Sequence, residues 1–182
     1  MKNDNFSSGM VKYVGHEIRA VIMNKLEMDV RDTVLLANAE SIAVEASMVA
    51  YEGVVIAAER DAGSLRTMEE NASKFGTHNI EIIPEITVEA LEKLPTPRLA
   101  FIVAQKSTIE NDIVTLLKVN PKIKFIIYTL ELDILADIKY LMKKHGVDVT
   151  EVMQIAVSKV DKNGVFVAQP APWMITCEVK EK

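Results

Sequence analysis

The residues with the clearest potential for chemistry follow directly after short apolar segments. The apolar stretch 34–37 runs into ANAES, residues 37–41, and a second apolar stretch, 53–58, is followed by Glu59. In α/β proteins a nucleotide or a nucleotide-like cofactor commonly lies where a buried strand meets the next helix. Glycine usually forms that junction, because the backbone must turn sharply and approach the ligand without a Cβ in between. Residues 37–41 contain no glycine, so the sequence indicates either a cofactor site of another design or a lost one.

Each polar residue at these junctions also has a purely structural interpretation. Glu40 can be an acid in the first turn of a helix, where the helix dipole favours negative charge, with Ser41 or Asn38 as the N-cap. Asn38 tolerates a left-handed backbone conformation, so a tight turn can form here without glycine. Glu59 can form a salt bridge with Arg60 or lie on the surface.

Other kinds of reactive site find no support in the sequence. The three histidines, His16, His78 and His145, are far apart, so no metal-ligand spacing is present. Neither His16 nor His145 has a nearby serine, cysteine or aspartate pattern typical of a nucleophile–base pair. The single cysteine, Cys177, excludes an internal disulfide and lacks any activating motif, so we expect an inert thiol in a reducing compartment.

The composition is that of an ordinary globular protein, with 49% apolar and 26% charged residues over 182 positions. A formal net charge of −5 argues against a general affinity for nucleic acid or for anionic membranes. The longest apolar runs are far shorter than the roughly 20 residues of a membrane span, and residues 1–10 lack the apolar stretch of a secretion signal. We therefore expect a cytoplasmic protein with a flexible N-terminal arm, residues 1–14, and a single domain over residues 15–182.

Strands and helices are expected to alternate along most of the chain. The expected strands are residues 33–37, 53–59, 79–83, 98–104 and 122–129, and the expected helices are residues 15–28, 41–50, 61–75, 87–94, 108–119 and 132–145. The strands are short and apolar without clear alternation, as is typical when helices cover both faces of a sheet. This order predicts an α/β fold with a doubly wound, mostly parallel sheet, whose strand-to-helix loops all lie along one edge.

The end of the chain departs from that rhythm. Residues 148–160 alternate in part, as strands do, and DKNG at 161–164 predicts a hairpin turn because Asn-Gly is a strong hairpin signal. Residues 165–179 are expected to return antiparallel, with an interruption around Pro170 and Pro172.

Parallel strands closed by an antiparallel hairpin resemble the class I S-adenosylmethionine-dependent methyltransferases. Three segments are similar to one branch of that group, the decarboxylating cobalt-precorrin (precorrin-6Y, C15) methyltransferases of cobalamin biosynthesis: HEIRAVIMNKL, AAERDAGSLRTMEENASKFGTHNIEIIPEITVEALEKLP and APWMIT. The resemblance covers about residues 9–177. It implies a Rossmann-like sheet of seven strands, S-adenosylmethionine as cofactor, a tetrapyrrole substrate and assembly into homo-tetramers.

The resemblance also implies which positions face the cofactor. After the first strand these are Ala37, Asn38, Glu40 and Ser41, in a loop two residues shorter than the family's glycine-rich one, and after the second strand Glu59 matches the acid that binds the ribose hydroxyls. Ile86 stands where the family has an aspartate for the adenine, and Ala104 follows the fourth strand. Gln105 and Lys106 come next, in the loop that borders the substrate in this family, where Lys106 can attract a substrate carboxylate or simply be solvated.

These departures from the family pattern predict weak or absent cofactor binding. Glu40 would repel the methionine carboxylate of the cofactor by an amount on the order of a few kcal/mol. Three interpretations remain open at this stage. The chain is a corrin methyltransferase with a divergent loop, a methyltransferase-like binding or assembly protein that has lost the cofactor, or the same fold reused for another small ligand.

Overall fold

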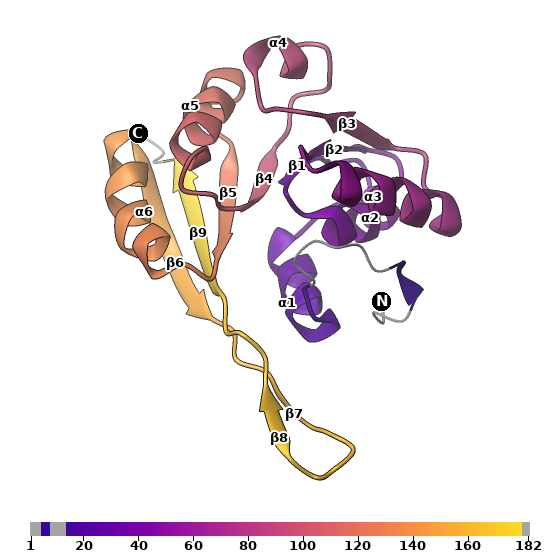
Figure 1. The fold of residues 1–182 in the computed structure, drawn as a ribbon. Helices are drawn as coiled ribbons and strands as arrows, with labels where there is room; N and C mark the ends of the chain where they lie inside the picture. The colour runs from indigo at the N-terminus through magenta and orange to yellow at the C-terminus, as the bar shows by residue number, and fades with distance from the viewer. Residues whose placement is uncertain (1–4, 8–13, 180–182) are drawn as a thin grey trace.

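The computed structural model of the chain describes residues 5–7 and 14–179 (Figure 1). In chain order the elements are α1 (His16–Leu26), β1 (Thr33–Ala37), α2 (Glu40–Val49), β2 (Val54–Ala58), α3 (Ala62–Phe75), β3 (Ile80–Ile83), α4 (Val88–Leu91), β4 (Leu99–Val103), α5 (Ile109–Val119), β5 (Lys124–Thr129), α6 (Leu132–Lys144), β6 (Val147–Gln154), β7 (Ser158–Val160), β8 (Phe166–Ala168) and β9 (Trp173–Val179). The expected alternation is therefore present, although the helix expected over 87–94 is a single turn.

Seven strands form one sheet in the order β3-β2-β1-β4-β5-β9-β6. Strands β1 to β5 run parallel, whereas β9 lies antiparallel to both β5 and β6. The predicted mostly parallel, Rossmann-like sheet is confirmed. Because β1 and β4 are neighbours at its centre, the direction of winding reverses between them, and ligands of open α/β sheets bind at such a reversal.

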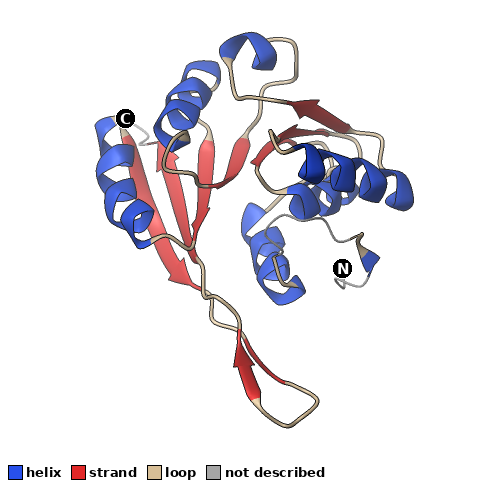
Figure 2. Ribbon diagram, viewed as in Figure 1, coloured by secondary structure: helices blue, strands red, loops and turns tan. Residues whose placement is uncertain are grey.

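Helices cover both faces of this sheet (Figure 2). On one face α1, α2 and α3 pack over side chains such as Val34 and Leu36 of β1, and on the other α4, α5 and α6 pack over Leu35 and its neighbours. The apolar stripes have helical spacing, since α6 buries Ile134, Ile138 and Met142, each four residues apart. No helix in the described part of the chain is long and apolar enough to cross a membrane.

The C-terminal hairpin differs from the expectation of one strand over residues 148–160. Strand β6 ends at Gln154, and β7 pairs with β8 in a separate two-stranded sheet that projects from the body (Figure 1). Pro170 and Pro172 explain the break, because proline has no N–H to donate to a ladder and β9 resumes only at Trp173. The turn at 161–164 is confirmed, with the Asp161 N–H donating to the Val165 carbonyl. We call residues 158–168 the projecting hairpin.

Most of the predicted N-terminal arm, residues 1–14, lies outside the described residues. Its described part contacts α3: the Phe6 and Phe75 ring centroids are 5.0 Å apart, and the Ser7 N–H donates to Asn71 Oδ1 at 2.7 Å. Val14 is buried beside the carboxyl edge of the sheet.

Candidate functional site

Asn38 forms the turn that joins β1 to α2. Its backbone has a φ of 54°, so the left-handed conformation expected in the absence of glycine is confirmed. The Asn38 N–H donates to the Ala58 carbonyl of β2 at 3.0 Å, and its side-chain amide donates to the Val103 carbonyl next to it on β4 at 3.2 Å. One asparagine therefore links three neighbouring strands where the winding reverses.

A cavity of about 160 Å³ lies beside this turn, at the carboxyl ends of the parallel strands. Its lining comes from the segment before α1, the loop after β1, the first turn of α2 and the ends of β2, β4 and β5: Val14, Asn38, Ala39, Glu40, Ser41, Ile42, Glu59, Val103, Ala104, Gln105, Tyr128 and Leu130. Among these described residues the only charged side chains are the two glutamates. We call this space the acidic cavity.

Glu59 is held in place by the backbone that follows it. Its side chain is 5% exposed, and Oε1 accepts hydrogen bonds from the N–H groups of Arg60 and Asp61, both at 2.9 Å. The other oxygen, Oε2, forms no hydrogen bond or ion pair with any described residue. Glu59 therefore presents a fixed, nearly buried carboxylate with one free oxygen at the end of β2.

Glu40 is the first residue of α2 and also lines the acidic cavity. Its Oε2 is buried and has no hydrogen-bond partner within residues 5–7 and 14–179. Burial, together with the negative charges of Glu59 and Asp61, raises the pKa of the carboxyl group to about 7, against the opposing effect of a hydrogen bond with the Ser64 side chain. Glu40 is therefore both an acid in the first turn of a helix and a residue that lines a cavity. The structural role expected for it does not exclude a role in binding.

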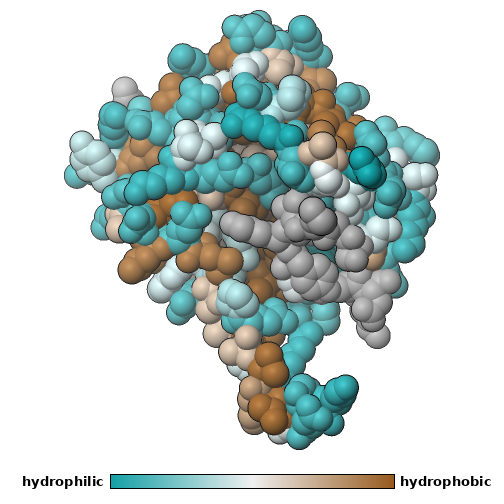
Figure 3. All heavy atoms as spheres, viewed as in Figure 1, coloured by the Kyte–Doolittle hydropathy of each residue, from teal (hydrophilic) through white to brown (hydrophobic). Residues whose placement is uncertain are grey.

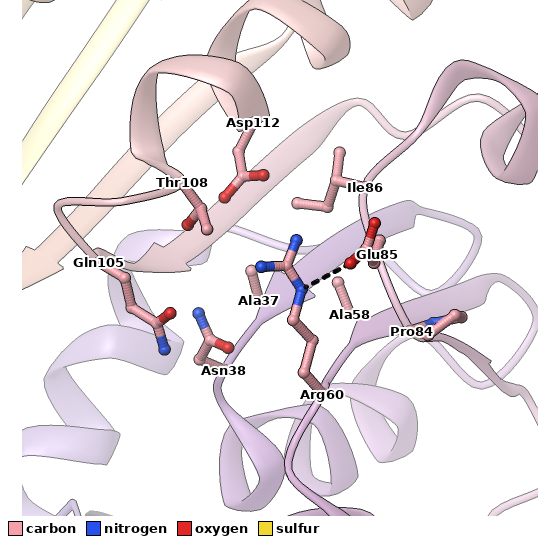
Figure 4. A pocket seen from close by; sticks show the side chains of 10 residues that line it. All are labelled: Ala37, Asn38, Ala58, Arg60, Pro84, Glu85, Ile86, Gln105, Thr108 and Asp112. Atoms are coloured by element: carbon pink, nitrogen blue, oxygen red, sulfur yellow. Dashed lines mark ion pairs between the residues drawn. The ribbon is translucent and has the colours of Figure 1, made fainter.

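A second cavity lies on the other side of Asn38, toward β2, β3 and α5. It is lined by Ala37, Asn38, Ala58, Arg60, Pro84, Glu85, Ile86, Gln105, Thr108 and Asp112 and has a volume of only about 20 Å³, room for about one water molecule. Figure 4 shows why, since the Arg60 side chain extends across the middle of it, with Nε 3.6 Å from Glu85 Oε1. Burial raises the pKa of the neighbouring Asp112 carboxyl group, whereas the positive charge of Arg60 lowers it. We call this space the arginine-filled cavity.

Asn38 and Gln105 line both cavities, so they form the wall between them. Their side chains lie next to each other in Figure 4, at one side of the Arg60 guanidinium. The carboxyl edge of the sheet, which is one continuous crevice in an open nucleotide-binding α/β fold, is here divided into two unequal parts.

The structure brings together all seven positions that the resemblance assigned to a cofactor. Glu40, Ser41, Glu59 and Ala104 line the acidic cavity, Ala37 and Ile86 line the arginine-filled cavity, and Asn38 lines both. What these residues bind stays a prediction.

The two residues assigned to substrate separate, although they are adjacent in sequence. Gln105 faces the cleft, whereas Lys106 lies in a groove between α5 and α6 and has its Nζ 3.4 Å from Asp133 Oδ2. Sequence reasoning missed Arg60 and Asp112 as lining residues. Arg60 could have been found because it directly follows Glu59 at the end of a strand. Asp112 lies within a helix, and its sequence position gave no such signal.

The described residues offer no geometry for a metal site and no activated thiol. They contain no group of three or more histidine, cysteine, aspartate or glutamate side chains that could hold a metal ion. Cys177 is fully buried in the sheet, and burial raises the pKa of its thiol to about 12, so it stays protonated at neutral pH.

A sequence profile described as a precorrin methyltransferase domain matches residues 9–179, nearly the whole chain. The chain belongs to the precorrin methyltransferase domain family. Methyltransferases of this family use S-adenosylmethionine as the methyl donor. A search among curated proteins finds no match.

Solved structures agree with this family's fold. The precorrin-6Y C5,15-methyltransferase from Geobacter metallireducens GS-15 shares 24% identity and has a TM-score of 0.88, over 99% of this chain and 97% of that one. The precorrin 8W decarboxylase from Methanobacterium thermoautotrophicum shares 19% identity with a TM-score of 0.82, over 98% and 100%. The C-terminal domain of precorrin-6Y C5,15-methyltransferase from Rhodobacter capsulatus has a TM-score of 0.77 at 14% identity, over 98% and 96%.

Proposed function

We propose that this member of the precorrin methyltransferase domain family has lost productive binding of S-adenosylmethionine and acts as a non-catalytic binding or assembly protein. The observation that carries the proposal is the wall of Asn38 and Gln105, which divides the cleft into two cavities. An adenosyl group and the sulfonium chain attached to it require one continuous crevice along the strand ends.

The chemistry of each cavity supports the same proposal. On the small side, Arg60 and Glu85 occupy the space with their own ion pair, and Ile86 offers hydrocarbon where the adenine amino group needs an acceptor. A missing hydrogen bond of that kind weakens binding by about 1–3 kcal/mol. On the large side, Glu40 adds a negative charge beside Glu59 where the cofactor would bring its own carboxylate.

Calorimetric titration with S-adenosylmethionine and S-adenosylhomocysteine tests the proposal. We expect dissociation constants weaker than about 1 mM for both. Tight, one-to-one binding of either compound by the wild-type chain would contradict it. A double variant, Asn38→Gly with Arg60→Ala, removes the wall residue and the filling side chain, so it should bind S-adenosylhomocysteine more tightly than wild type. Arg31→Ala is the matched control, because Arg31 forms an exposed ion pair with Glu52 outside both cavities.

A second candidate function is a decarboxylating corrin C15-methyltransferase with a divergent loop. Glu59 favours it, because this acid stands at the ribose position of the family and keeps one oxygen free toward the cavity. Methyl transfer relies mainly on proximity and alignment of the two reactants. Transfer of a labelled methyl group from S-adenosylmethionine to a cobalt-precorrin substrate at rates above the uncatalysed reaction would select this candidate.

We further propose that copies of this chain assemble through the projecting hairpin. A two-stranded ribbon is at best marginally stable alone in water, yet this one exposes Val160, Val165, Phe166 and Val167 by 52% to 76%. Figure 3 shows apolar atoms on the part of the molecule that projects from the body, beside hydrophilic atoms. A second copy of the chain could cover them and pair with the open strand edges.

Sedimentation analysis tests this assembly. Phe166→Asp should convert an oligomer, a tetramer by the family resemblance, into monomers, because a charge would have to be buried at the contact. Tyr140→Asp is the matched control, since Tyr140 is an equally exposed aromatic residue, 75% against 76%, on α6. Wild-type protein that sediments as a monomer would overturn the proposal.

A further inference from the structure

We propose that the acidic cavity binds a small organic cation that carries an amine and no carboxylate, with its ammonium group between Glu40 and Glu59. The inference rests on the proposed function in one respect, namely that S-adenosylmethionine is not the ligand of this cavity. It adds the chemical class of the ligand.

The two carboxyl groups are only partly satisfied: Glu59 accepts two backbone N–H groups through Oε1, and the Ser64 side chain hydrogen-bonds to Glu40. Glu59 is 5% exposed and its Oε2 has no partner among the described residues, and Glu40 Oε2 is buried without one. Buried polar atoms are hydrogen-bonded with few exceptions, and unpaired buried charges are strongly unfavourable. No lysine or arginine lines this cavity in the described chain. The missing donor therefore has to come from outside the described residues, and an ammonium group supplies up to three N–H donors and a positive charge.

The rest of the lining fits an apolar chain rather than a second charge. Val103, Leu130 and the ring of Tyr128 face the cavity, which at about 160 Å³ is several times larger than the space one water needs. Burial raises the pKa of the Tyr128 hydroxyl group, so this residue adds no charge at neutral pH. A short aliphatic amine can place its head between the glutamates and its chain along this apolar wall.

The same charges exclude a ligand that carries its own carboxylate. Glu40 and Glu59 would both repel it, and with no basic residue in the lining nothing compensates. This discrimination makes the inference specific, because it predicts opposite results for pairs of compounds that differ in a single carboxyl group.

Two matched pairs of probes test it by calorimetry at pH 8. Cadaverine differs from lysine, and putrescine differs from ornithine, only by a carboxyl group. We expect the decarboxylated member of at least one pair to bind tenfold or more tightly than its partner. Glu40→Gln should reduce that preference to less than threefold. Glu52→Gln, at an exposed glutamate outside the cavity, should leave it unchanged.

The pH dependence of the wild-type chain provides a second readout that needs no variant. The groups that face Glu40 are Glu59 after β2, Asp61 and Ser64 at the start of α3, and Tyr128 on β5. With the pKa of Glu40 near 7, its charged fraction rises about tenfold between pH 6 and pH 8. Aliphatic amines stay protonated throughout, so the affinity for cadaverine should rise by up to tenfold over this range.

The outcomes separate this inference from the proposed function. If neither cadaverine nor putrescine binds with a dissociation constant below about 10 mM, the inference is wrong while the proposed function stands. If S-adenosylmethionine binds with a dissociation constant below about 1 mM, the proposed function is wrong, and the inference that rests on it is wrong as well. If amines bind with the same affinity at pH 6 and pH 8 and to Glu40→Gln, the amine is held elsewhere and the inference is wrong.

Discussion

The two cavities at the carboxyl edge of the sheet treat charge in opposite ways. In the arginine-filled cavity, Arg60 lies close to Glu85 and also near Asp112, and almost no space is left. In the acidic cavity, Glu40 and Glu59 face a much larger space whose lining, within residues 5–7 and 14–179, contains no basic side chain. The two share a wall only two side chains wide. This contrast shows that the first cavity balances its charges within the chain, whereas in our proposal the second receives its counter-charge from a ligand.

A substitution in the wall between the cavities should cause the largest loss of unfolding free energy. Asn38→Ala removes the amide bond to Val103 and places alanine at a left-handed φ, so we expect a loss of about 2–3 kcal/mol of unfolding free energy. Gln105→Ala, at the other wall residue, should stay within about 0.5 kcal/mol, because its side chain makes no hydrogen bond that holds the fold. Urea denaturation measures both. Equal losses of unfolding free energy would show that Asn38 and Gln105 contribute equally to stability, contrary to this prediction.

Removing a charge from the acidic cavity should change the free energy of unfolding by an intermediate amount that depends on pH. The pKa of Glu40 is raised from 4.5 to about 7, so the folded state binds the proton more tightly than the unfolded state. The stability from this group is therefore present below pH 4.5 and is lost as the pH rises through 7. After an allowance for solvent screening, Glu40→Gln should be more stable than wild type by about 1–2 kcal/mol at pH 8.

Two comparisons accompany that measurement, which uses thermal or urea unfolding. At pH 4 wild type and Glu40→Gln should be equally stable, because Glu40 is then neutral in both the folded and unfolded states. Glu59→Gln should be less stable than wild type, since Oε1 of Glu59 accepts two backbone N–H groups. A Glu40→Gln variant that is destabilised at pH 8 would mean that Glu40 already has a partner.

The arginine-filled cavity should give the smallest change in stability. The Arg60–Glu85 pair is partly exposed, with 46% and 59% of the side chains accessible, so Arg60→Ala should alter the unfolding free energy by less than about 1 kcal/mol. The same urea titration applies. A loss much larger than this would make Arg60 a structural residue and would weaken the view that it merely occupies ligand space.

The strands and helices could be predicted from sequence because they depend on local patterns, whereas the cleft positions came from the family resemblance. Apolar runs fixed the parallel strands, and the asparagine at position 38 indicated a turn that glycine was not needed to form. The break between β6 and β7 was not predicted. It arises from Pro170 and Pro172 on the segment that pairs with them, so the pattern of residues 148–160 alone does not contain the signal.

The division of the cleft could not be predicted in this way. Whether Arg60 points into the cleft or to solvent depends on Glu85, which reaches it from a different strand end. Gln105 and Lys106 are neighbours in one loop, yet their side chains enter different spaces. Side-chain direction in loops follows tertiary contacts, and residue spacing carries little information about it.

The side chain of Asn38 has two roles, one in holding the sheet together and one in shaping the cleft. Its amide fastens β1 to β4, and the same amide helps to wall off the cleft. If, as we propose, Asn38 helps to exclude an adenosyl group, any descendant of this chain that admits one by mutating this residue would loosen the middle of its own sheet. Such a lineage would first have to strengthen the contact between β1 and β4 at another point. Ligand specificity and stability would therefore evolve together at this position.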